Sequence, residues 1–408
     1  MKIAIFTDTY LPQVNGVVTF LQDSIRILSK SHEIVVFAPG KGPHRIEQQE
    51  GGVTVHWIPS TGFPLYEGYR MASINYKRVS DMLKKEKPDI VHVHAPVILG
   101  LEGIIAAKRS KIPIVITYHT HFPDYVFSIM KGKLPSVFGK ISAFTVKKMI
   151  SHVFRMADIV TAPTMELVAE LSSYGLENVV YLPNGIDFSK FEIKDFTAED
   201  QDRFRAGLGI SGRRMVLYAG RISFEKRLDI VLEAFRWVDE GGAVLVIVGS
   251  GPHLNSLKAL SKDLSLDNVI FTGFVDQRTL ASFYKCADIF VSASDTETFG
   301  LTFIEAMDQG VPVIGVNKLG AKEVIDDGKS GLLAEPGSAS SLAVCMKRLL
   351  EHESLRKRMG RNAKIRARKF TIEESIRKTV LIYQDAVHSH AKKAAKAKQR
   401  ARKVTGFI

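Results

Sequence analysis

Short, mainly apolar runs recur along the whole chain and alternate with longer stretches of helical periodicity. Runs of this kind indicate strands buried on both faces, which belong to parallel sheets covered by helices. In the first half of the chain these runs are Ile3–Phe6, Ile34–Phe37, Val53–Trp57, Ile90–Val93, Ile114–Thr117, Ile159–Ala162 and Val179–Leu182. In the second half they are Met215–Tyr218, Val244–Val248, Val269–Thr272, Ile289–Ser292 and Val311–Gly315. The pattern predicts an α/β fold with doubly wound parallel sheets.

The alternation is interrupted near Asn184–Asp200, where the chain is polar, rich in turn-forming residues and largely without periodicity. A chain of 408 residues is expected to form about two domains. We therefore predict one domain at 1–190 and a second at 195–370. A last helix at 371–390 is expected to return to the first domain, ahead of a low-complexity basic tail at 391–408.

Composition narrows the class of protein. The hydrophobic fraction of 45% and the charged fraction of 24% are ordinary for a globular protein. Two cysteines, Cys286 and Cys345, suit a reducing compartment and supply neither a disulfide framework nor a cysteine-rich metal site. No apolar run reaches the roughly 18 residues of a membrane span, and the first residues read as a strand rather than a signal peptide. We expect a cytoplasmic protein, peripheral at the inner face of the cell membrane.

The net charge of +13 comes from two acid-free stretches. The first holds Lys131, Lys133, Lys140, Lys147, Lys148 and Arg155, and the second holds Lys392, Lys393, Lys396, Lys398, Arg400, Arg402 and Lys403. Such local patches indicate an anionic surface as partner. A nucleic acid is the alternative, although no recognised reading motif accompanies the basic residues.

The stretch Lys131–Arg155 also has the pattern of an amphipathic helix. Its polar arc holds Lys140, Lys147, Lys148, Ser151 and Arg155 together with Phe144, and its apolar arc holds Val146, Met149, Ile150, Val153 and Phe154. A basic face of this kind binds anionic lipid. A solvated face over a core stripe is the alternative.

Two segments carry the main candidate chemistry. GRISFEKR, residues 220–227, follows a strand and is expected to open a helix, where Arg221 and Lys226 can bind phosphate. TETFGLTFIE, residues 296–305, places Glu297 in a loop and Glu305 in a helix over Leu301–Gln309, where Glu305 can take two ribose hydroxyls. The alternatives are a solvated basic loop and two ordinary glutamates.

Two further segments lie in the first domain. The loop at 8–17 ends in Asn15-Gly16, either a second set of phosphate-facing N–H donors or simply a turn. Four histidines, His92, His94, His119 and His121, lie at the ends of two predicted strands. They are interpreted as hydrogen-bonding side chains of a polar crevice, with a zinc site or purely structural histidines as alternatives.

GRISFEKR, TETFGLTFIEAM, PNGID and YHTHF together resemble the retaining GT-B glycosyltransferases of family four, over nearly the whole chain to about Tyr383. The YHTHFPDY stretch is most similar to enzymes that glycosylate diacylglycerol-type lipids; phosphatidylinositol mannosyltransferases are similar too. The resemblance implies two Rossmann-like domains facing across a cleft. It also implies transfer of a hexose from a nucleoside diphosphate sugar, with UDP the expected nucleotide, to a hydroxyl acceptor.

The resemblance also implies roles for individual residues. Arg221 and Lys226 would neutralise the donor diphosphate, Glu305 would bind the ribose, and Glu297 would contact the sugar hydroxyls. Backbone groups of Phe299, Gly300 and Leu301 would contact the donor, and the backbone of Val275 would meet the base. Asn15 and Gly16 would face the phosphates. His119 would touch the sugar.

In such enzymes the departing phosphate accepts the acceptor's proton, so the resemblance implies no cofactor and no required metal. The alternatives are a soluble sugar phosphate or polysaccharide as acceptor, a basic nucleic-acid-binding protein, or an epimerase on the same architecture. The glutamate pair and PNGID argue against the epimerase.

Overall fold

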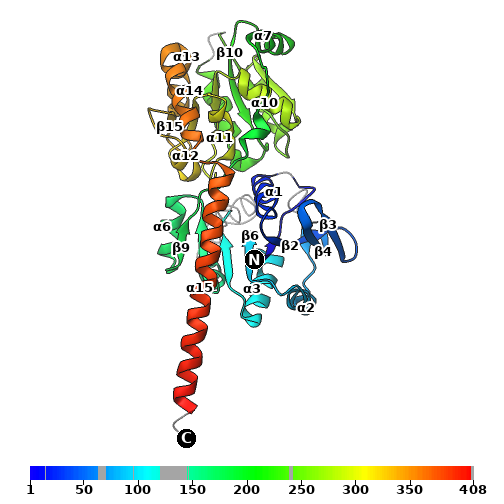
Figure 1. Ribbon diagram of the computed structural model, residues 1–408. Helices are drawn as coiled ribbons and strands as arrows, with labels where there is room; N and C mark the ends of the chain where they lie inside the picture. Colours follow the sequence, from blue (N-terminus) through cyan, green and yellow to red (C-terminus); the bar gives the residue numbers. More distant parts are fainter. Residues whose placement is uncertain are drawn as a thin grey trace. The chain divides into compact units, whose positions relative to one another are not determined.

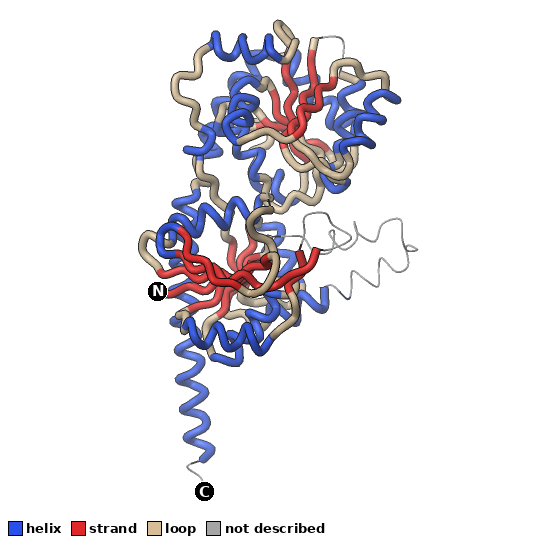
Figure 2. Tube along the Cα trace, turned by 90° about the vertical axis from the view of Figure 1, so that its right-hand side faces the viewer, coloured by secondary structure: helices blue, strands red, loops and turns tan. Residues whose placement is uncertain are grey.

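The computed structural model describes residues 1–13, 15–62, 70–94, 96–119, 145, 147–238 and 242–405. The chain divides into two compact units: unit 1 is Met1–Pro183 with Ile372–Ile408, and unit 2 is Asn184–Thr371. Each unit is built on a mainly parallel sheet flanked by helices (Figures 1 and 2). The α/β class with two doubly wound parallel sheets, predicted from the apolar runs, is confirmed.

The unit 1 sheet has the strand order β3-β4-β2-β1-β6-β7-β8-β9. Its strands are β1 (Lys2–Thr7), β2 (Glu33–Gly40), β3 (Arg45–Gln49), β4 (Val53–Gly62), β6 (Ile90–His94), β7 (Ile114–Thr117), β8 (Ile159–Ala162) and β9 (Val179–Tyr181). Neighbours pair in parallel except β3, which is antiparallel to β4; β5 (Arg70–Ala72) is also antiparallel to β4. The apolar runs did not predict β3 and β5, because both contain polar or exposed residues at the sheet margin.

The described helices of unit 1 include α1 (Gly16–Leu28), the short 3-10 helix η1 (Glu50–Gly52), α2 (Tyr76–Glu86), α3 (Leu99–Ser110), α6 (Met165–Ser173) and α15 (Ile372–Thr405). Ile376 and Tyr383 of α15 share one buried cluster with Ile3 and Ile5 of β1, so this helix covers one face of the unit 1 sheet. The helix runs past the predicted end at residue 390 to Thr405 (Figure 1, in red).

The basic stretch before β8 differs from its predicted helical arcs. Most of Lys131–Arg155 lies outside the described residues, but residues 147–154 are helical. Ser151, assigned to the solvent arc, is buried and donates a 2.9 Å hydrogen bond to the Tyr174 carbonyl. Met149, assigned to the apolar arc, is 55% exposed. A hydroxyl bonded to a backbone carbonyl can be buried at little cost, which residue-type periodicity does not register.

The unit 2 sheet has the order β12-β11-β10-β13-β14-β15, and every neighbouring pair is parallel. Its strands are β10 (Arg214–Ala219), β11 (Ala243–Val248), β12 (Val269–Gly273), β13 (Ile289–Val291), β14 (Val313–Val316) and β15 (Gly331–Ala334). Only β15 was not predicted, because its apolar run is very short.

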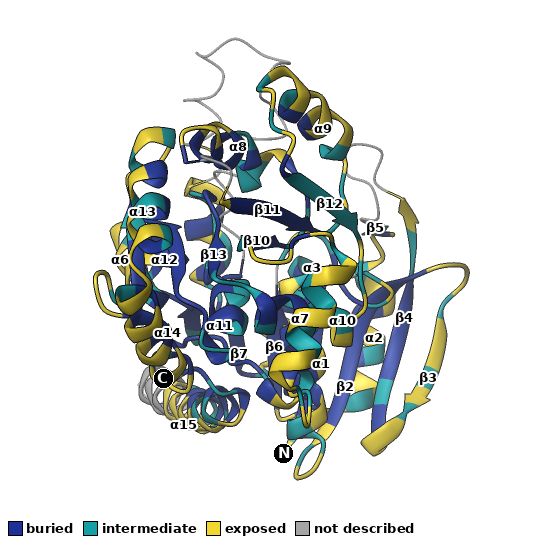
Figure 3. Ribbon diagram, turned by 90° about the horizontal axis from the view of Figure 1, so that it is seen from above, coloured by how far each residue is buried: buried dark blue, intermediate teal, exposed yellow. Residues whose placement is uncertain are grey.

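Alternate residues of β10 enter two different clusters. Met215 and Leu217 pack with side chains of α10, α11 and α14, whereas Val216 and Tyr218 pack with those of α8, α9 and α13. Both faces of the sheet are therefore covered, which explains its continuous apolar runs. Figure 3 shows β10, β11 and β13 in the buried colour, the edge strand β12 in the intermediate colour and the outer helix faces as exposed.

The described helices of unit 2 include two short 3-10 helices. They are η2 (Phe188–Phe191), α7 (Ala198–Gly207), η3 (Phe224–Lys226), α8 (Leu228–Arg236), α9 (Leu254–Asp263), α10 (Gln277–Cys286), α11 (Leu301–Asp308), α12 (Leu319–Val324), α13 (Ala339–Glu351) and α14 (Glu353–Ala367). No helix in the described ranges of either unit is at once long and apolar enough to cross a membrane.

Candidate active site

The strand order of unit 2 reverses between β10 and β13, and such a reversal is where ligands bind in open α/β sheets. The loops that follow these two strands contain both candidate motifs. They are joined by an ion pair in which Lys226 Nζ lies 2.5 Å from Glu297 Oε2. The two side chains remain 25% and 21% exposed, so the pair can still be reached by a ligand.

GRISFEKR follows a strand and leads into a helix, as predicted, but the α-helix begins directly after the segment. Lys226 ends the short 3-10 turn η3, Arg227 has a left-handed backbone, and α8 begins only at Leu228. The turn is held instead by the other loop, because the Glu225 carbonyl accepts hydrogen bonds from Ser294 Oγ at 3.2 Å and Thr296 Oγ1 at 3.4 Å. Lys226 is thus positioned by loop-to-loop contacts rather than by a helix N-terminus.

Glycines bring the loops after β10 and β11 close together. A Cβ on Gly249 would lie 1.9 Å from the Gly220 carbonyl oxygen, and one on Gly251 would lie 2.2 Å from the Ile222 oxygen. Only glycine fits at such distances. Arg221 lies between these contacts, partly buried, and its carbonyl accepts a 2.9 Å hydrogen bond from Tyr218 Oη.

The glutamate motif enters α11 through Gly300, whose φ of 91° favours glycine. A Cβ there would lie 2.7 Å from Phe303 Cδ2. Phe299 is buried, and the carbonyl of Glu297 accepts from the Gly320 amide at 2.8 Å. The helix start at Leu301 was predicted from sequence, and the structure has α11 begin at that residue.

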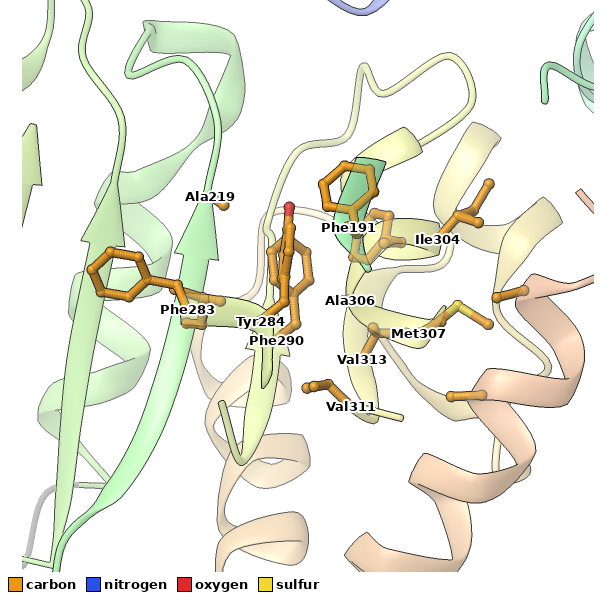
Figure 4. Packing of buried hydrophobic residues seen from close by; sticks show 14 of the residues in the cluster. Phe191, Ala219, Phe283, Tyr284, Phe290, Ile304, Ala306, Met307, Val311 and Val313 are labelled. Atoms are coloured by element: carbon orange, nitrogen blue, oxygen red, sulfur yellow. The ribbon is translucent and has the colours of Figure 1, made fainter. Parts of the chain in front are cut away.

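Glu305, one turn into α11, is partly buried and accepts a 2.7 Å hydrogen bond at Oε2 from the Tyr284 hydroxyl. Burial raises the pKa of Glu305 to about 7; the nearby charge of Glu297 adds to this, while Tyr284 and Lys190 oppose it. Because Oε2 is bonded to Tyr284, Oε1 is the oxygen through which a ligand hydroxyl would chiefly bind. Figure 4 shows the Tyr284 ring among the buried side chains, beside Phe290.

Tyr284 was not among the predicted site residues. It is fully buried in α10, and burial raises the pKa of its hydroxyl well above the ordinary value, so the hydroxyl remains a donor. No local pattern could link it to Glu305, which lies 21 positions away. Val275 lies in the loop between β12 and α10, partly buried against the same core cluster.

In unit 1, Asn15 caps α1. Its Oδ1 accepts from the Val18 amide at 3.0 Å and its Nδ2 donates to Thr9 Oγ1 at 3.0 Å, while Gly16 is exposed as the first residue of the helix. These bonds give Asn15 a structural role at the start of α1. The contact of Asn15 and Gly16 with phosphate stays a prediction.

Asp8 is the first residue of the loop at 8–17 that the sequence pointed to, but no role was predicted for its carboxylate. Its carboxylate is 2% exposed and lies at the end of β1, beside the end of β6 where the unit 1 strand order reverses. Burial raises its pKa, which four accepted hydrogen bonds partly offset. The donors are the backbone N–H groups of Val97, Ile98, Leu99 and Gly100, at 2.8 to 3.1 Å. The carboxylate therefore caps α3.

Of the four candidate histidines, the structure describes His92, His94 and His119, and all three are buried and in contact with one another. His119 Nε2 lies 2.7 Å from His94 Nδ1, and His94 Nε2 lies 3.1 Å from His92 Nδ1. Burial lowers the pKa of His92 and of His119 to about 3, and that of His94 well below its ordinary value, so all three are neutral at pH 7. His121 lies outside the described residues. The ring nitrogens bond to one another instead of converging on a cation, and within the described residues no group of histidine, cysteine or acidic side chains could hold a metal ion.

Both halves of the chain match family models of glycosyltransferases. Residues 14–190 match the family model described as "Glycosyltransferase Family 4". Residues 200–366 match the model described as "Glycosyl transferases group 1".

Two relatives carry the same name. The chain is 36% identical to the alpha-monoglucosyldiacylglycerol synthase of Streptococcus pneumoniae, over 82% of this chain and 75% of that protein. It is 27% identical to the alpha-monoglucosyldiacylglycerol synthase of Acholeplasma laidlawii, over 97% of this chain and all of that protein. In fold it is similar to HepE of Anabaena, solved in complex with UDP and glucose. The TM-score is 0.74 at 19% identity, and the match covers 94% of this chain and all of that one.

Proposed function

Since the chain belongs to the retaining glycosyltransferases of group 1 and family 4, which have the GT-B fold, we propose a specific reaction for it. In this reaction the protein transfers glucose from UDP-glucose to a diacylglycerol-type membrane lipid. Hexosyl transfer follows from the family. The sugar, the nucleotide and the lipid are the proposal, and they are supported by the names of the two synthases and by the UDP and glucose bound to HepE.

The observation that carries the proposal is the contact of Lys226 with Glu297 at the strand-order reversal of unit 2. We assign Lys226 and Arg221 to the donor diphosphate, because a point charge and a planar two-pronged cation both suit phosphate oxygens. Glu297 then accepts from the sugar hydroxyls next to the cation that holds the leaving group. When the diphosphate arrives it competes with Glu297 for Lys226.

The remaining donor contacts follow from the same loops. Glu305 accepts from the ribose, chiefly through Oε1, while Tyr284 fixes Oε2. Backbone groups of Phe299, Gly300 and Leu301 face the phosphate and sugar, and the backbone at Val275 meets the base. For unit 1 we propose that Asn15 and Gly16 contact phosphate and that His119 contacts the sugar.

In the proposed reaction the bond between the anomeric carbon and the phosphate oxygen breaks as the acceptor oxygen forms a bond on the same face of the sugar. The departing phosphate takes the proton of the acceptor hydroxyl, so the products are the glucoside and UDP. The protein's main contribution is to stabilise the negative charge that develops on that phosphate, the role assigned to Lys226 and Arg221.

The acceptor assignment is tested by offering one donor panel and two acceptor classes. Full-length protein is incubated with UDP-glucose, UDP-galactose and GDP-mannose, together with phosphatidylglycerol vesicles containing diacylglycerol, or with glucose phosphate in solution. We expect an α-glucosyl diacylglycerol from UDP-glucose alone. Product on the soluble acceptor, or none on the vesicles, contradicts the lipid assignment; a β-linked product contradicts retention.

Membrane association is proposed to be peripheral and electrostatic. Exposed lysines of both basic stretches, Lys147 and Lys148 before β8 and Lys392 and Lys393 on α15, carry positive charge on unit 1. Each such lysine contributes about 1 kcal/mol near an anionic surface. Removing residues 391–408 is therefore expected to weaken binding to phosphatidylglycerol vesicles more than tenfold, while donor hydrolysis in solution is unchanged. Binding equal to that of the full chain removes this segment from the membrane assignment.

A further inference from the structure

Arg221 follows a glycine, so the local backbone leaves the direction of its side chain open. Gly220, the residue before it, has a φ of 147°, in the region that favours glycine. Because glycine lacks a Cβ, it has more accessible conformations than any other residue. A guanidinium that binds phosphate through two parallel donors must nevertheless be held in one orientation. The restraint on Arg221 must therefore come from the elements packed around the turn.

The peptide unit that joins Arg221 to Ile222 is hydrogen-bonded at both of its polar groups. Its carbonyl oxygen accepts from Tyr218 Oη at 2.9 Å, and its N–H donates to the Ser250 carbonyl at 2.9 Å. In a trans peptide these two groups point in opposite directions, so the two bonds together prevent rotation of the peptide plane. The orientation of this peptide unit, which we call the clamped peptide, determines where the Arg221 side chain points.

Tyr218 reaches the clamped peptide from the buried side of the turn. Its ring belongs to the cluster that packs with α8, and the residue is 2% exposed. A Cβ on Gly220 would lie 3.2 Å from Tyr218 Oη, so the chain passes directly over the hydroxyl. Burial raises the pKa of that hydroxyl, and the charges of Glu297 and Glu225 raise it further. The hydroxyl therefore keeps its proton and donates it to the carbonyl.

Lys226, the other cation of the same loop, is held by different bonds. The carbonyl of Glu225, directly before it, accepts from Ser294 and Thr296 in the loop after β13. The bond to the Arg221 carbonyl comes instead from β10. The two candidate phosphate cations are thus positioned independently of each other.

We propose that Tyr218 is a positioning residue of the donor site, which directs the Arg221 side chain toward the diphosphate by holding the Arg221 carbonyl. This inference rests on the proposed function, in which Arg221 binds the donor diphosphate. Tyr218 acts through Arg221 and not on the donor itself, because its ring is enclosed and its proton is committed to the carbonyl. Loss of the hydroxyl releases one side of the clamped peptide and leaves the bond to Ser250 in place.

The test is a double-mutant cycle in which UDP binding to the full-length chain is measured by isothermal titration calorimetry. Tyr218→Phe removes only the hydroxyl and is expected to raise the Kd for UDP about tenfold, the effect of one lost hydrogen bond. Arg221→Met removes the cation and is expected to raise this Kd about 100-fold. In the Arg221→Met background, Tyr218→Phe should change the Kd less than about twofold, because the group that it positions is gone.

Lys226→Met provides the complementary background. Since Lys226 is held by other bonds, Tyr218→Phe should keep its full tenfold effect there. The matched control is Ser261→Ala, which removes a buried hydroxyl from the Leu266 carbonyl, 3.4 Å away in unit 2, and should leave UDP binding unchanged. An effect of Tyr218→Phe that persists in Arg221→Met, is lost in Lys226→Met or is absent from the otherwise wild-type chain overturns the proposal.

Hydrogen exchange of the Ile222 amide separates this inference from the proposed function. That N–H belongs to the clamped peptide, so its exchange rate is expected to rise about tenfold in Tyr218→Phe and to stay unchanged in Ser261→Ala. An unchanged rate in Tyr218→Phe, with urea unfolding showing that the variant is folded, overturns the clamp. If Arg221→Met binds UDP as tightly as the wild type, Arg221 is removed from the donor site and the directing role of Tyr218 fails with it. The exchange rate then still decides whether Tyr218 holds the peptide.

Discussion

The two units contain the same topological feature and use it differently. Among the parallel strands of each sheet, the strand order reverses between β10 and β13 in unit 2 and between β1 and β6 in unit 1. In unit 2 this place holds the partly exposed Lys226–Glu297 pair. In unit 1 it holds Asp8, whose carboxylate is enclosed by four backbone N–H groups.

The difference shows how a charge becomes available for function. A partly exposed ion pair stabilises a fold by about 0 to 1 kcal/mol, so Lys226 and Glu297 can exchange partners with a ligand at little cost. A buried carboxylate that accepts several hydrogen bonds contributes far more, and removing them leaves buried donors without partners. The unit 2 residues are therefore expected to affect activity, and Asp8 to affect stability.

The largest effect is expected from Lys226→Met, which keeps the side-chain stem and removes the charge. Loss of one group that stabilises the leaving phosphate should lower kcat by about 10³-fold, roughly 4 kcal/mol. Steady-state transfer assays measure this, and thermal unfolding should shift little. The matched control is Lys357→Met, which removes a lysine paired with Glu353 at 2.6 Å on the surface of α14 and should leave kcat unchanged. Activity within threefold of the wild type would remove Lys226 from the donor site.

The second largest effect is expected from a substitution of Asp8, which should lower the free energy of unfolding. In Asp8→Asn one acceptor oxygen becomes an NH₂ group facing two backbone N–H donors, which should destabilise unit 1 by about 3 kcal/mol. Urea unfolding, combined with hydrogen exchange of the first amides of α3, measures the change. If Asp8→Asn instead leaves unfolding unaltered and abolishes transfer at saturating donor, the contrast between the two units is wrong.

The third effect concerns Glu305→Gln, which preserves shape but removes the charge that ribose hydroxyls bind. The KM for the donor should rise about 30-fold, about 2 kcal/mol, with a smaller change in kcat. Because burial raises the pKa of Glu305 to about 7, its ionised fraction increases over the neutral range. The wild-type KM should therefore fall as pH rises through about 7, and that pH dependence should vanish in the variant.

Stability should depend on pH in the opposite sense. A folded-state pKa above the ordinary value of 4.5 means that folding favours the protonated carboxyl. The resulting stabilisation is fully present below pH 4.5 and is lost as pH rises through about 7. Denaturant titrations of wild type and Glu305→Gln without donor should differ in this slope. Parallel curves would show that Glu305 titrates near its ordinary pKa.

The local pattern of hydrophobic and polar residues predicted most strands of this protein. Continuous apolar runs predicted every strand of unit 2 except β15, because burial on both faces leaves a signal in adjacent residues. The segment TETFGLTFIE predicted the start of α11 at Leu301. The same reasoning missed β3, whose polar residues pair at the sheet margin. It also misplaced Ser151, because a hydrogen bond to a distant carbonyl decides whether that hydroxyl is buried.

The tertiary structure alone decided which polar groups meet. Lys226 contacts Glu297 across 71 positions, Asp8 caps a helix at Gly100 across 92, and Tyr383 reaches His92 across 291. Hydrophobic periodicity is a property of neighbouring residues and can be recognised in one segment, whereas a hydrogen bond or ion pair requires two segments at the same place. The sequence thus determined the two sheets and named candidate cations and carboxylates. Only the folded chain decided which of those charges are enclosed by backbone donors and which stay open to a ligand.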